Sequence, residues 1–287
     1  MPELPEVETI RRGLETAMVG RTIEDVRVRV PKLFIGDQEM LFERTVTSIE
    51  RFGKLLVFRL DSPNVLTVHL KMTGQLIWKP GDGGETVMGG HPEKSYIESL
   101  PSKHTHIQLE FTDGSTLYFN DLRKFGLMRV LLASELEELG FVLSLGPDPL
   151  EQDFTVGYLK ERLMKRPKLA VKTFLLDQSN IAGLGNIYAD ESLFSAAILP
   201  YRLSGELTDS EVRNLHTSII ETLELALQHG GSSSRDYLSA TGDKGTYLTI
   251  ANVYHRTGQG CNRCGLGTIE RMKIGGRSSH YCLLCQR

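Results

Sequence analysis

The first residues of the chain combine a secondary amine with two carboxylates. Pro2 becomes the N-terminal residue once Met1 is removed, and its free ring nitrogen is then a nucleophile that can attack a sugar or carbonyl carbon. The product of such an attack is an iminium ion. The reference pKa of an α-amino group is roughly 7.7–8.0, so an appreciable fraction of it is unprotonated near neutral pH. Glu3 and Glu6 lie three residues apart, on one side of a helix if the segment is helical. The alternative is structural, because proline and acidic residues are both common in the first turn of a helix.

The four cysteines form two pairs with the spacing of metal ligands. Cys261-x-x-Cys264 and Cys282-x-x-Cys285 are separated by 17 residues, which is typical of a tetrahedral zinc site with four thiolate ligands. Two disulfides are disfavoured, because the acidic N-terminus lacks the apolar core of a signal peptide and a reduced compartment is expected. A redox site would need only one pair. We therefore expect one structural Zn2+, with no open coordination position.

The segment between the cysteine pairs predicts a β-hairpin, because two short alternating runs flank Gly275-Gly276. This zinc ribbon is too short to bury its own core, so metal binding and folding should be coupled. Residues 253–287 carry six basic side chains and one acidic one, a net charge of +5 in a chain whose total is −3. Such a local basic module favours contact with nucleic acid, and a solvated ribbon face is the alternative.

The rest of the chain divides into a β-rich part and a helical part. Apolar residues at helical spacing predict a helix up to Gly20, and runs of β-branched and apolar residues then predict a β-sandwich. These runs are Thr22–Val30, Thr45–Leu60, Val65–Leu70, Gln75–Trp78, His106–Phe111, Thr116–Phe119 and Leu127–Leu132. The polar, glycine-rich stretch Lys79–Lys103 predicts a long, mobile loop. An acidic stretch broken by Gly146-Pro147-Asp148-Pro149 indicates a domain boundary.

Helical patterns follow this boundary. Thr208-x-x-Glu211 is a capping box ahead of an apolar stripe that ends at Gly230-Gly231. Gly183 and Gly185 precede another helix, where backbone N–H groups could hold a phosphate or simply form a tight turn between helices.

Three further residues each allow two interpretations, contact with a nucleic acid or an ordinary structural role. Met72 and Phe125 each lie near a glycine at an expected turn, beside basic residues, where large apolar side chains can enter a base stack. The alternative is that both are ordinary core residues. Lys54 follows Phe52-Gly53 and is expected either to bind a phosphate or to be solvated.

Taken together, these motifs closely resemble the bacterial formamidopyrimidine-DNA glycosylase family. The resemblance spans nearly the whole chain, and its motifs are PELPEVET, FGKLL, HLKMTG, NDLRKFG, GLGNIYADE, and VYHRTGQGCNRCG through YCLLCQR. It implies an α+β fold: an N-terminal helix with a β-sandwich, then a helix-two-turn-helix domain and a four-cysteine zinc ribbon, with DNA in the cleft. The expected divisions are 1–133, an acidic linker at 134–153, the helix-two-turn-helix domain with a lesion-capping loop at 154–252, and the ribbon at 253–287.

The resemblance also implies a role for each matching residue. Pro2 is the implied nucleophile at C1′ of the damaged nucleoside, Glu3 the proton-transfer residue that helps open the sugar, and Glu6 a support of the active site. Lys54 is implied to bind a phosphate near the lesion.

Further implied residues contact DNA or metal. Met72, Arg123 and Phe125 would fill the gap left by an everted base, with Arg123 facing the orphaned cytosine. The residues implied to touch the DNA backbone are Asn186, Arg277 and His91. The implied zinc ligands are Cys261, Cys264, Cys282 and Cys285. Segment 232–247 aligns with the loop that closes over the everted base.

The implied activity is excision of 8-oxoguanine and formamidopyrimidines from damaged double-stranded DNA, followed by β,δ-elimination at the abasic site. One rival is the endonuclease VIII branch, which removes oxidised pyrimidines, although Leu4 and the set Met72, Arg123 and Phe125 fit the purine branch. The other is a non-catalytic zinc-ribbon DNA-binding protein, which would need no free Pro2. We further expect a cytoplasmic bacterial monomer, associated with the nucleoid when bound to DNA, with no membrane partner and no nucleotide cofactor.

Overall fold

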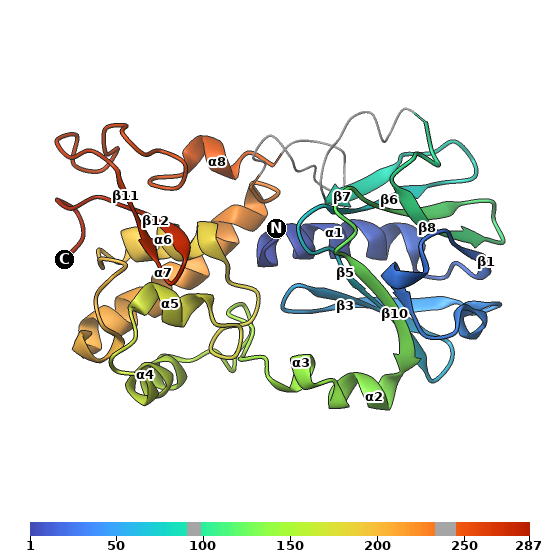
Figure 1. Cartoon of the computed structure of the whole chain (residues 1–287), viewed down its shortest axis with the longest axis horizontal. Coiled ribbons are helices and arrows are strands. Elements are labelled where there is room, and N and C mark those ends of the chain that lie inside the picture. Colours follow the sequence, from blue (N-terminus) through green and yellow to red (C-terminus); the bar gives the residue numbers. More distant parts are fainter. Residues whose placement is uncertain (91–98, 233–244) are drawn as a thin grey trace. The chain divides into compact units, whose positions relative to one another are not determined.

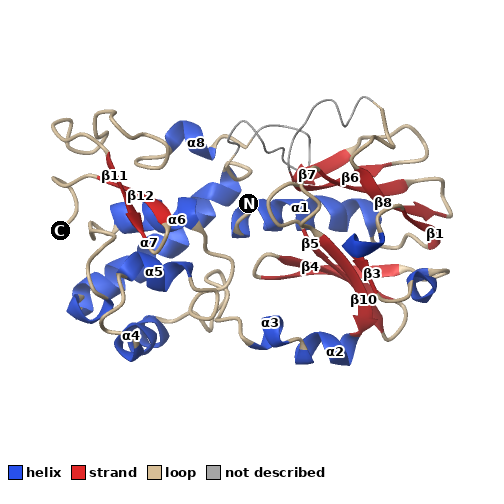
Figure 2. Cartoon of the chain, viewed as in Figure 1, coloured by secondary structure: helices blue, strands red, loops and turns tan. Residues whose placement is uncertain are grey.

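The computed structural model describes residues 1–90, 99–232 and 245–287, and these divide into two compact units. The N-terminal unit comprises residues 1–143 and 229–246, and the C-terminal unit comprises residues 144–228 and 247–287. Each unit has its own elements (Figures 1 and 2). None of the helices in these ranges is long and apolar enough to span a lipid bilayer.

The N-terminal unit is a sandwich of two five-stranded sheets, as far as the described residues show. The first sheet has the order β1 (Ile23–Val28), β8 (Thr105–Phe111), β9 (Thr116–Asp121), β6 (Gly74–Lys79) and β7 (Val87–Gly90). The second has the order β2 (Phe34–Ile35), β10 (Leu127–Leu132), β5 (Asn64–His69), β4 (Leu55–Leu60) and β3 (Val46–Phe52). All neighbouring strands are antiparallel except β10 and β2.

Helix α1 (Leu4–Met18) packs against β7 of the first sheet and β3 of the second, the edge strand of each (Figure 1). Its apolar stripe of Val7, Ile10, Leu14 and Met18 joins the continuous core formed by both sheets. The approach to β7 is close: a Cβ at Gly89 would lie 2.2 Å from Ile10 Cγ1, so only glycine fits there. The sandwich thereby holds the start of the chain in a fixed place.

The run Thr45–Leu60 forms β3 and β4, because Gly53 takes φ +58° and turns the chain between them. Two sequence expectations for this unit need correction. The expected loop Lys79–Lys103 contains β7, which pairs with β6. The acidic stretch is not a bare linker, because its start forms α2 (Ala133–Glu138) and α3 (Gly140–Leu143). Leu136 of α2 is buried against Val57 and Val65 of the second sheet, and this contact explains why the segment folds.

The C-terminal unit is mainly helical, with a small hairpin. Its helices are α4 (Val156–Lys165), α5 (Val171–Leu176), α6 (Asn186–Ser195), α7 (Asp209–Gln228) and α8 (Tyr247–Ile250). Helix α7 begins as expected: Thr208 N–H donates to Glu211 Oε2 (2.8 Å), and Glu211 N–H donates to Thr208 Oγ1 (3.3 Å). The predicted hairpin is confirmed as β11 (Glu270–Ile274) and β12 (Arg277–Tyr281), joined by Gly275-Gly276.

Candidate functional site

The N-terminal amine and its two carboxylates lie at the start of α1. Pro2 is buried, whereas Met1 is 54% exposed. Glu3 and Glu6 are also buried, and Glu6 Oε2 accepts a hydrogen bond from Glu3 N–H (2.8 Å). Oε1 of Glu6 accepts two more, from Ser232 N–H (2.7 Å) and Ser232 Oγ (2.9 Å). Glu6 thus joins the first turn of α1 to Ser232, and segment 233–244, which follows it, lies outside the described residues.

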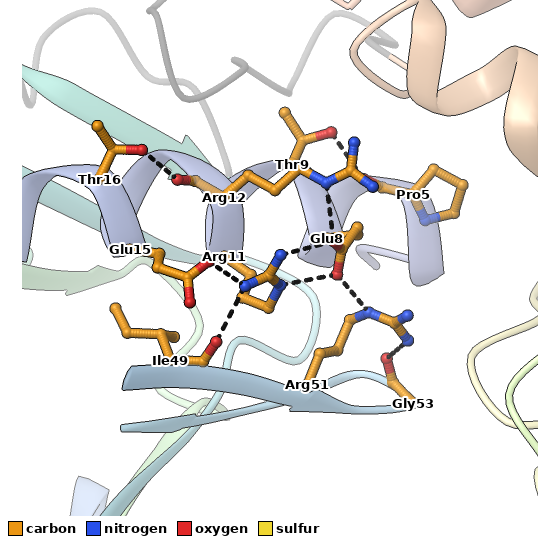
Figure 3. Close-up of polar contacts among 10 residues, drawn as sticks. All are labelled: Pro5, Glu8, Thr9, Arg11, Arg12, Glu15, Thr16, Ile49, Arg51 and Gly53. Atoms are coloured by element: carbon orange, nitrogen blue, oxygen red, sulfur yellow. Dashed lines mark hydrogen bonds and ion pairs between the residues drawn. The ribbon is translucent and has the colours of Figure 1, made fainter. Parts of the chain in front are cut away.

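A third buried carboxylate, Glu8, anchors α1 to β3 (Figure 3). Its oxygens accept hydrogen bonds from Arg11 (3.0 Å), Arg12 (2.8 Å) and Arg51 (3.0 Å). Arg51 also donates to the carbonyl oxygen of Gly53 (3.1 Å), the residue before Lys54. This network therefore connects the helix that follows Pro2 with the turn that carries Lys54.

Charge and burial set the protonation of two groups in this region. Burial alone raises the pKa of Glu8, but hydrogen bonds from Arg11 and Arg51 outweigh it and lower that pKa to about 2. Burial, with the charges of Lys71 and Lys54, lowers the pKa of His69 to about 3. Glu8 is therefore ionised at neutral pH and His69 is neutral. His69 Nδ1 accepts a hydrogen bond from Lys71 N–H (3.0 Å), which holds the residue before Met72.

Met72 and Phe125 are exposed, at 47% and 54%, so they are not core residues. Arg123 contacts both residues. Its Nη1 is 3.1 Å from Met72 Sδ, and its guanidinium carbon lies 4.7 Å from the centroid of the Phe125 ring. The structure thus brings together residues from two turns that are far apart in the sequence. Lys54 is buried, which excludes a freely solvated side chain. His91 lies outside the described residues.

The C-terminal unit places Asn186 at the first position of α6 and Arg277, exposed, at the start of β12. Two buried carboxylates on α6, which the sequence reasoning missed, hold the surrounding chain. Asp190 contacts Lys172 Nζ (2.5 Å) and accepts from His280 N–H of β12 (3.0 Å). Asp190 therefore links the helix that begins with Asn186 to the strand that begins with Arg277.

Glu191, the next residue on α6, holds the segment between α8 and the ribbon. Its carboxylate oxygens accept hydrogen bonds from three consecutive backbone N–H groups, each at 2.8 Å. The donors are Asn252, Val253 and Tyr254. Two adjacent carboxylates of one helix thus fix both the entry to the ribbon and its second strand.

The four cysteines converge as the spacing predicts. Their sulfur atoms all lie within 4.8 Å of one another, with Cys261 and Cys285 Sγ at 3.6 Å and Cys264 and Cys282 Sγ at 3.9 Å. A tetrahedral zinc with Zn–S bonds of about 2.3 Å separates its sulfurs by about 3.8 Å, so this donor set fits such an ion. Backbone N–H groups of Gly267 and Leu266 lower the pKa of the Cys264 thiol to about 6, which favours a thiolate ligand.

Comparison with known proteins agrees with these features. Residues 1–128 match the family model of the formamidopyrimidine-DNA glycosylase N-terminal domain, and residues 145–237 match its H2TH domain. The formamidopyrimidine-DNA glycosylase of Geobacillus kaustophilus is 41% identical to this chain, and the alignment covers 100% of both proteins. The one of Streptococcus pneumoniae is 40% identical, and the alignment covers 100% of this chain and 99% of that protein.

Solved structures of the Lactococcus lactis protein are similar over the whole fold. Its complex with DNA containing an abasic site has a TM-score of 0.86 at 35% identity, with 99% of each chain covered. Its complex with DNA containing Fapy-dG has a TM-score of 0.85 at 34% identity, covering 99% of this chain and 100% of that one. The chain therefore belongs to the formamidopyrimidine-DNA glycosylase family and is a DNA repair glycosylase.

Proposed function

We propose that the protein, as a monomer, excises oxidised purines from duplex DNA and cleaves the resulting abasic site by β,δ-elimination. The observation that carries this proposal is the start of α1, where buried Pro2 precedes two buried carboxylates and Glu6 is held by three hydrogen bonds. With Met1 removed, the ring nitrogen of Pro2 is an amine beside acid–base groups, which is what nucleophilic attack on a sugar carbon requires.

The chemistry begins with attack of the Pro2 nitrogen on C1′ of the damaged nucleoside. The bond from C1′ to the base breaks, the electron pair leaves with the base, and the base takes up a proton. Glu3 transfers a proton to the ring oxygen as the sugar opens, which leaves an iminium ion between Pro2 and C1′. The iminium makes the C2′ proton acidic, so the 3′ phosphate leaves by β-elimination and the 5′ phosphate by δ-elimination.

The target nucleotide must leave the base stack before C1′ can be reached, at a cost of a few kcal/mol. The exposed group of Met72, Arg123 and Phe125 offsets this cost by occupying the vacated space, with Arg123 facing the orphaned cytosine. Lys54 binds a phosphate near the lesion. Asn186 and Arg277 bind flanking phosphates, which fix register without reading sequence.

The cysteine cluster holds a structural zinc ion in this proposal. Four thiolates leave no open coordination position, so the metal stabilises the ribbon and takes no part in the reaction. What the ribbon contributes is Arg277, on a strand that Asp190 joins to α6.

Comparison of two substrates tests the proposal. We expect faster single-turnover excision of 8-oxoguanine opposite cytosine than of thymine glycol, with products cut on both sides of the lesion. Preference for thymine glycol would instead support the oxidised-pyrimidine branch. Binding to both duplexes without release of a base would support the non-catalytic alternative.

A further inference from the structure

We propose that Asp121 is a positioning residue that sets discrimination of the base opposite the lesion. The proposal rests on the function proposed above, in which Met72, Arg123 and Phe125 fill the vacated space. We call these three side chains the wedge. Asp121 is the last residue of β9 and is fully buried. The sequence motifs predict no role for it.

The Asp121 carboxylate gathers four donors from the two segments that carry the wedge. Oδ2 accepts hydrogen bonds from Phe125 N–H (2.8 Å) and Gly126 N–H (2.6 Å). Oδ1 accepts from Arg123 N–H (3.1 Å) and from the hydroxyl of Thr73. Arg123 N–H is shared with Thr73 Oγ1 (3.0 Å). One carboxylate and one hydroxyl thus join the 121–126 turn to the segment that contains Met72.

Both segments are strained beside a wedge residue. Lys71, before Met72, has φ +52°, and Lys124, before Phe125, has φ +56°. Side-chain-bearing residues rarely adopt this left-handed conformation, which is strained and persists only where other contacts enforce it. At Lys124, the hydrogen bonds of its neighbours to Asp121 supply that enforcement. At Lys71, the hydrogen bond from its N–H to His69 Nδ1 does so. On the other side of Met72, the hydrogen bond from the Thr73 hydroxyl to Asp121 holds the chain.

The consequence is a wedge ordered before DNA arrives. Exposed side chains without such support would sample many rotamers, and ordering each of them on binding would cost conformational entropy. With its backbone locked, Arg123 presents its guanidinium in one place, between Met72 Sδ and the Phe125 ring. A guanidinium in a fixed position distinguishes hydrogen-bond acceptors on a facing base, whereas a mobile one adapts to several.

The test is Asp121→Asn in the full-length, zinc-loaded protein. The amide keeps the shape of the side chain, but its NH2 group accepts no hydrogen bond, so N–H groups of the turn lose an acceptor. We expect single-turnover excision of 8-oxoguanine opposite cytosine to slow by about tenfold, since a hydrogen bond to a charged group contributes about that factor or more. The decisive readout is the ratio of excision rates opposite cytosine and opposite adenine, which we expect to fall several-fold. Affinity for undamaged duplex should change less than about twofold, because phosphate contacts remain.

Asp113→Asn is the matched control. Asp113 also organises a turn of the first sheet, where its Oδ1 accepts hydrogen bonds from Ser115 N–H (3.0 Å) and the Ser115 hydroxyl. Its Oδ2 pairs with Arg21, and neither Ser115 nor Arg21 belongs to the wedge. The cytosine-to-adenine ratio should be unchanged in this variant. An equal loss of the ratio in both variants would show general destabilisation and overturn the proposal.

A second pair of variants keeps the proposal testable if Asp121→Asn does not fold. Thr73→Val removes the hydroxyl that bridges the two segments and should lower the ratio, whereas Thr73→Ser retains the hydroxyl and should restore it. If Thr73→Val and Asp121→Asn both leave the enzyme active with an unchanged cytosine-to-adenine ratio, the role proposed for Asp121 is wrong. The proposed function would not be affected by that result. Absence of 8-oxoguanine excision by the wild-type protein would instead contradict the proposed function.

Discussion

The two units position their functional residues in different ways. In the N-terminal unit, residues at the ends of strands and at the start of α1 are held by Glu6, Glu8 and Asp121, beside a core shared by α1 and both sheets. The ribbon of the C-terminal unit packs around a cluster of five buried residues, of which Cys261 and Cys282 are two. Buried carboxylates hold both regions, because Asp190 and Glu191 also fix the ribbon, but the ribbon depends in addition on its four cysteines and the zinc ion that we propose they bind.

This difference means that metal removal should affect one unit and spare the other. Trp78, the only tryptophan of the chain, reports on the N-terminal unit, because it is buried in β6 with its ring centroid 4.9 Å from that of Phe111. Its fluorescence therefore separates events in the sandwich from events in the ribbon.

The largest effect is expected from Cys282→Ser. Loss of a ligand removes metal-coupled folding free energy on the order of 10 kcal/mol, so the ribbon should unfold. DNA affinity should fall by about 100-fold or more as the phosphate contacts that we propose for the ribbon are lost. The denaturation midpoint followed by Trp78 fluorescence should not move.

Ser279→Ala serves as the control for this change. Ser279 is buried in the same hairpin and its hydroxyl has no hydrogen-bond partner among the described residues, so its removal should leave affinity unchanged. A shift of the Trp78 midpoint in Cys282→Ser would show that the two units are not independent in this respect.

A smaller effect is expected from Asp190→Asn. The substitution removes the carboxylate that contacts buried Lys172 and the backbone of His280, and breaking a buried ion pair costs about 3–5 kcal/mol. Calorimetry should show a destabilised C-terminal unit with zinc still bound, and the phosphate contact that we propose for Arg277 should weaken. Unaltered stability would mean that the cysteine cluster alone holds β12 in place.

The smallest effect concerns acid stability of the N-terminal unit. The folded-state pKa of Glu8 is about 2 against 4.5 for the free side chain, so its contribution is fully present above about pH 4.5. This contribution to the free energy of unfolding, about 3 kcal/mol, is lost as the pH falls from 4.5 towards 2. Glu8→Gln should therefore flatten the pH dependence of the Trp78 midpoint in this window.

Glu211 provides the comparison from the other unit. A hydrogen bond from Arg202 also lowers its pKa to about 2, but this pair is partly exposed, so solvent screens it more strongly than it screens Glu8. Glu211→Gln should therefore cost less than Glu8→Gln, and equal losses would contradict the assigned role of burial.

Local patterns in the sequence predicted what depends on local spacing. The cysteine pairs, the Gly275-Gly276 hairpin and the capping box of α7 were all predicted, because each is set by residues close in sequence. Contacts across long separations left no such signal. Thr73 and Asp121 are 48 residues apart, and Arg51 reaches Glu8 across 43.

Strand β7 was missed for a related reason. Gly89 and Gly90 read as loop residues in a polar stretch, yet glycine is present because Ile10 of α1 packs directly against Gly89. The exposure of Met72 and Phe125 likewise depends on which way two turns face, and apolar residue type alone favours burial. The sequence could place these side chains at turns but could not orient them.

The most direct test of the account is to reduce the reaction intermediate with borohydride on duplex containing 8-oxoguanine and to map the cross-linked peptide by mass spectrometry. We predict DNA attached to a peptide that begins at Pro2, with Met1 absent, and no cross-link in protein carrying an N-terminal tag ahead of Met1. A cross-link at Lys54 or another lysine, or efficient trapping by the tagged protein, would contradict Pro2 as the nucleophile.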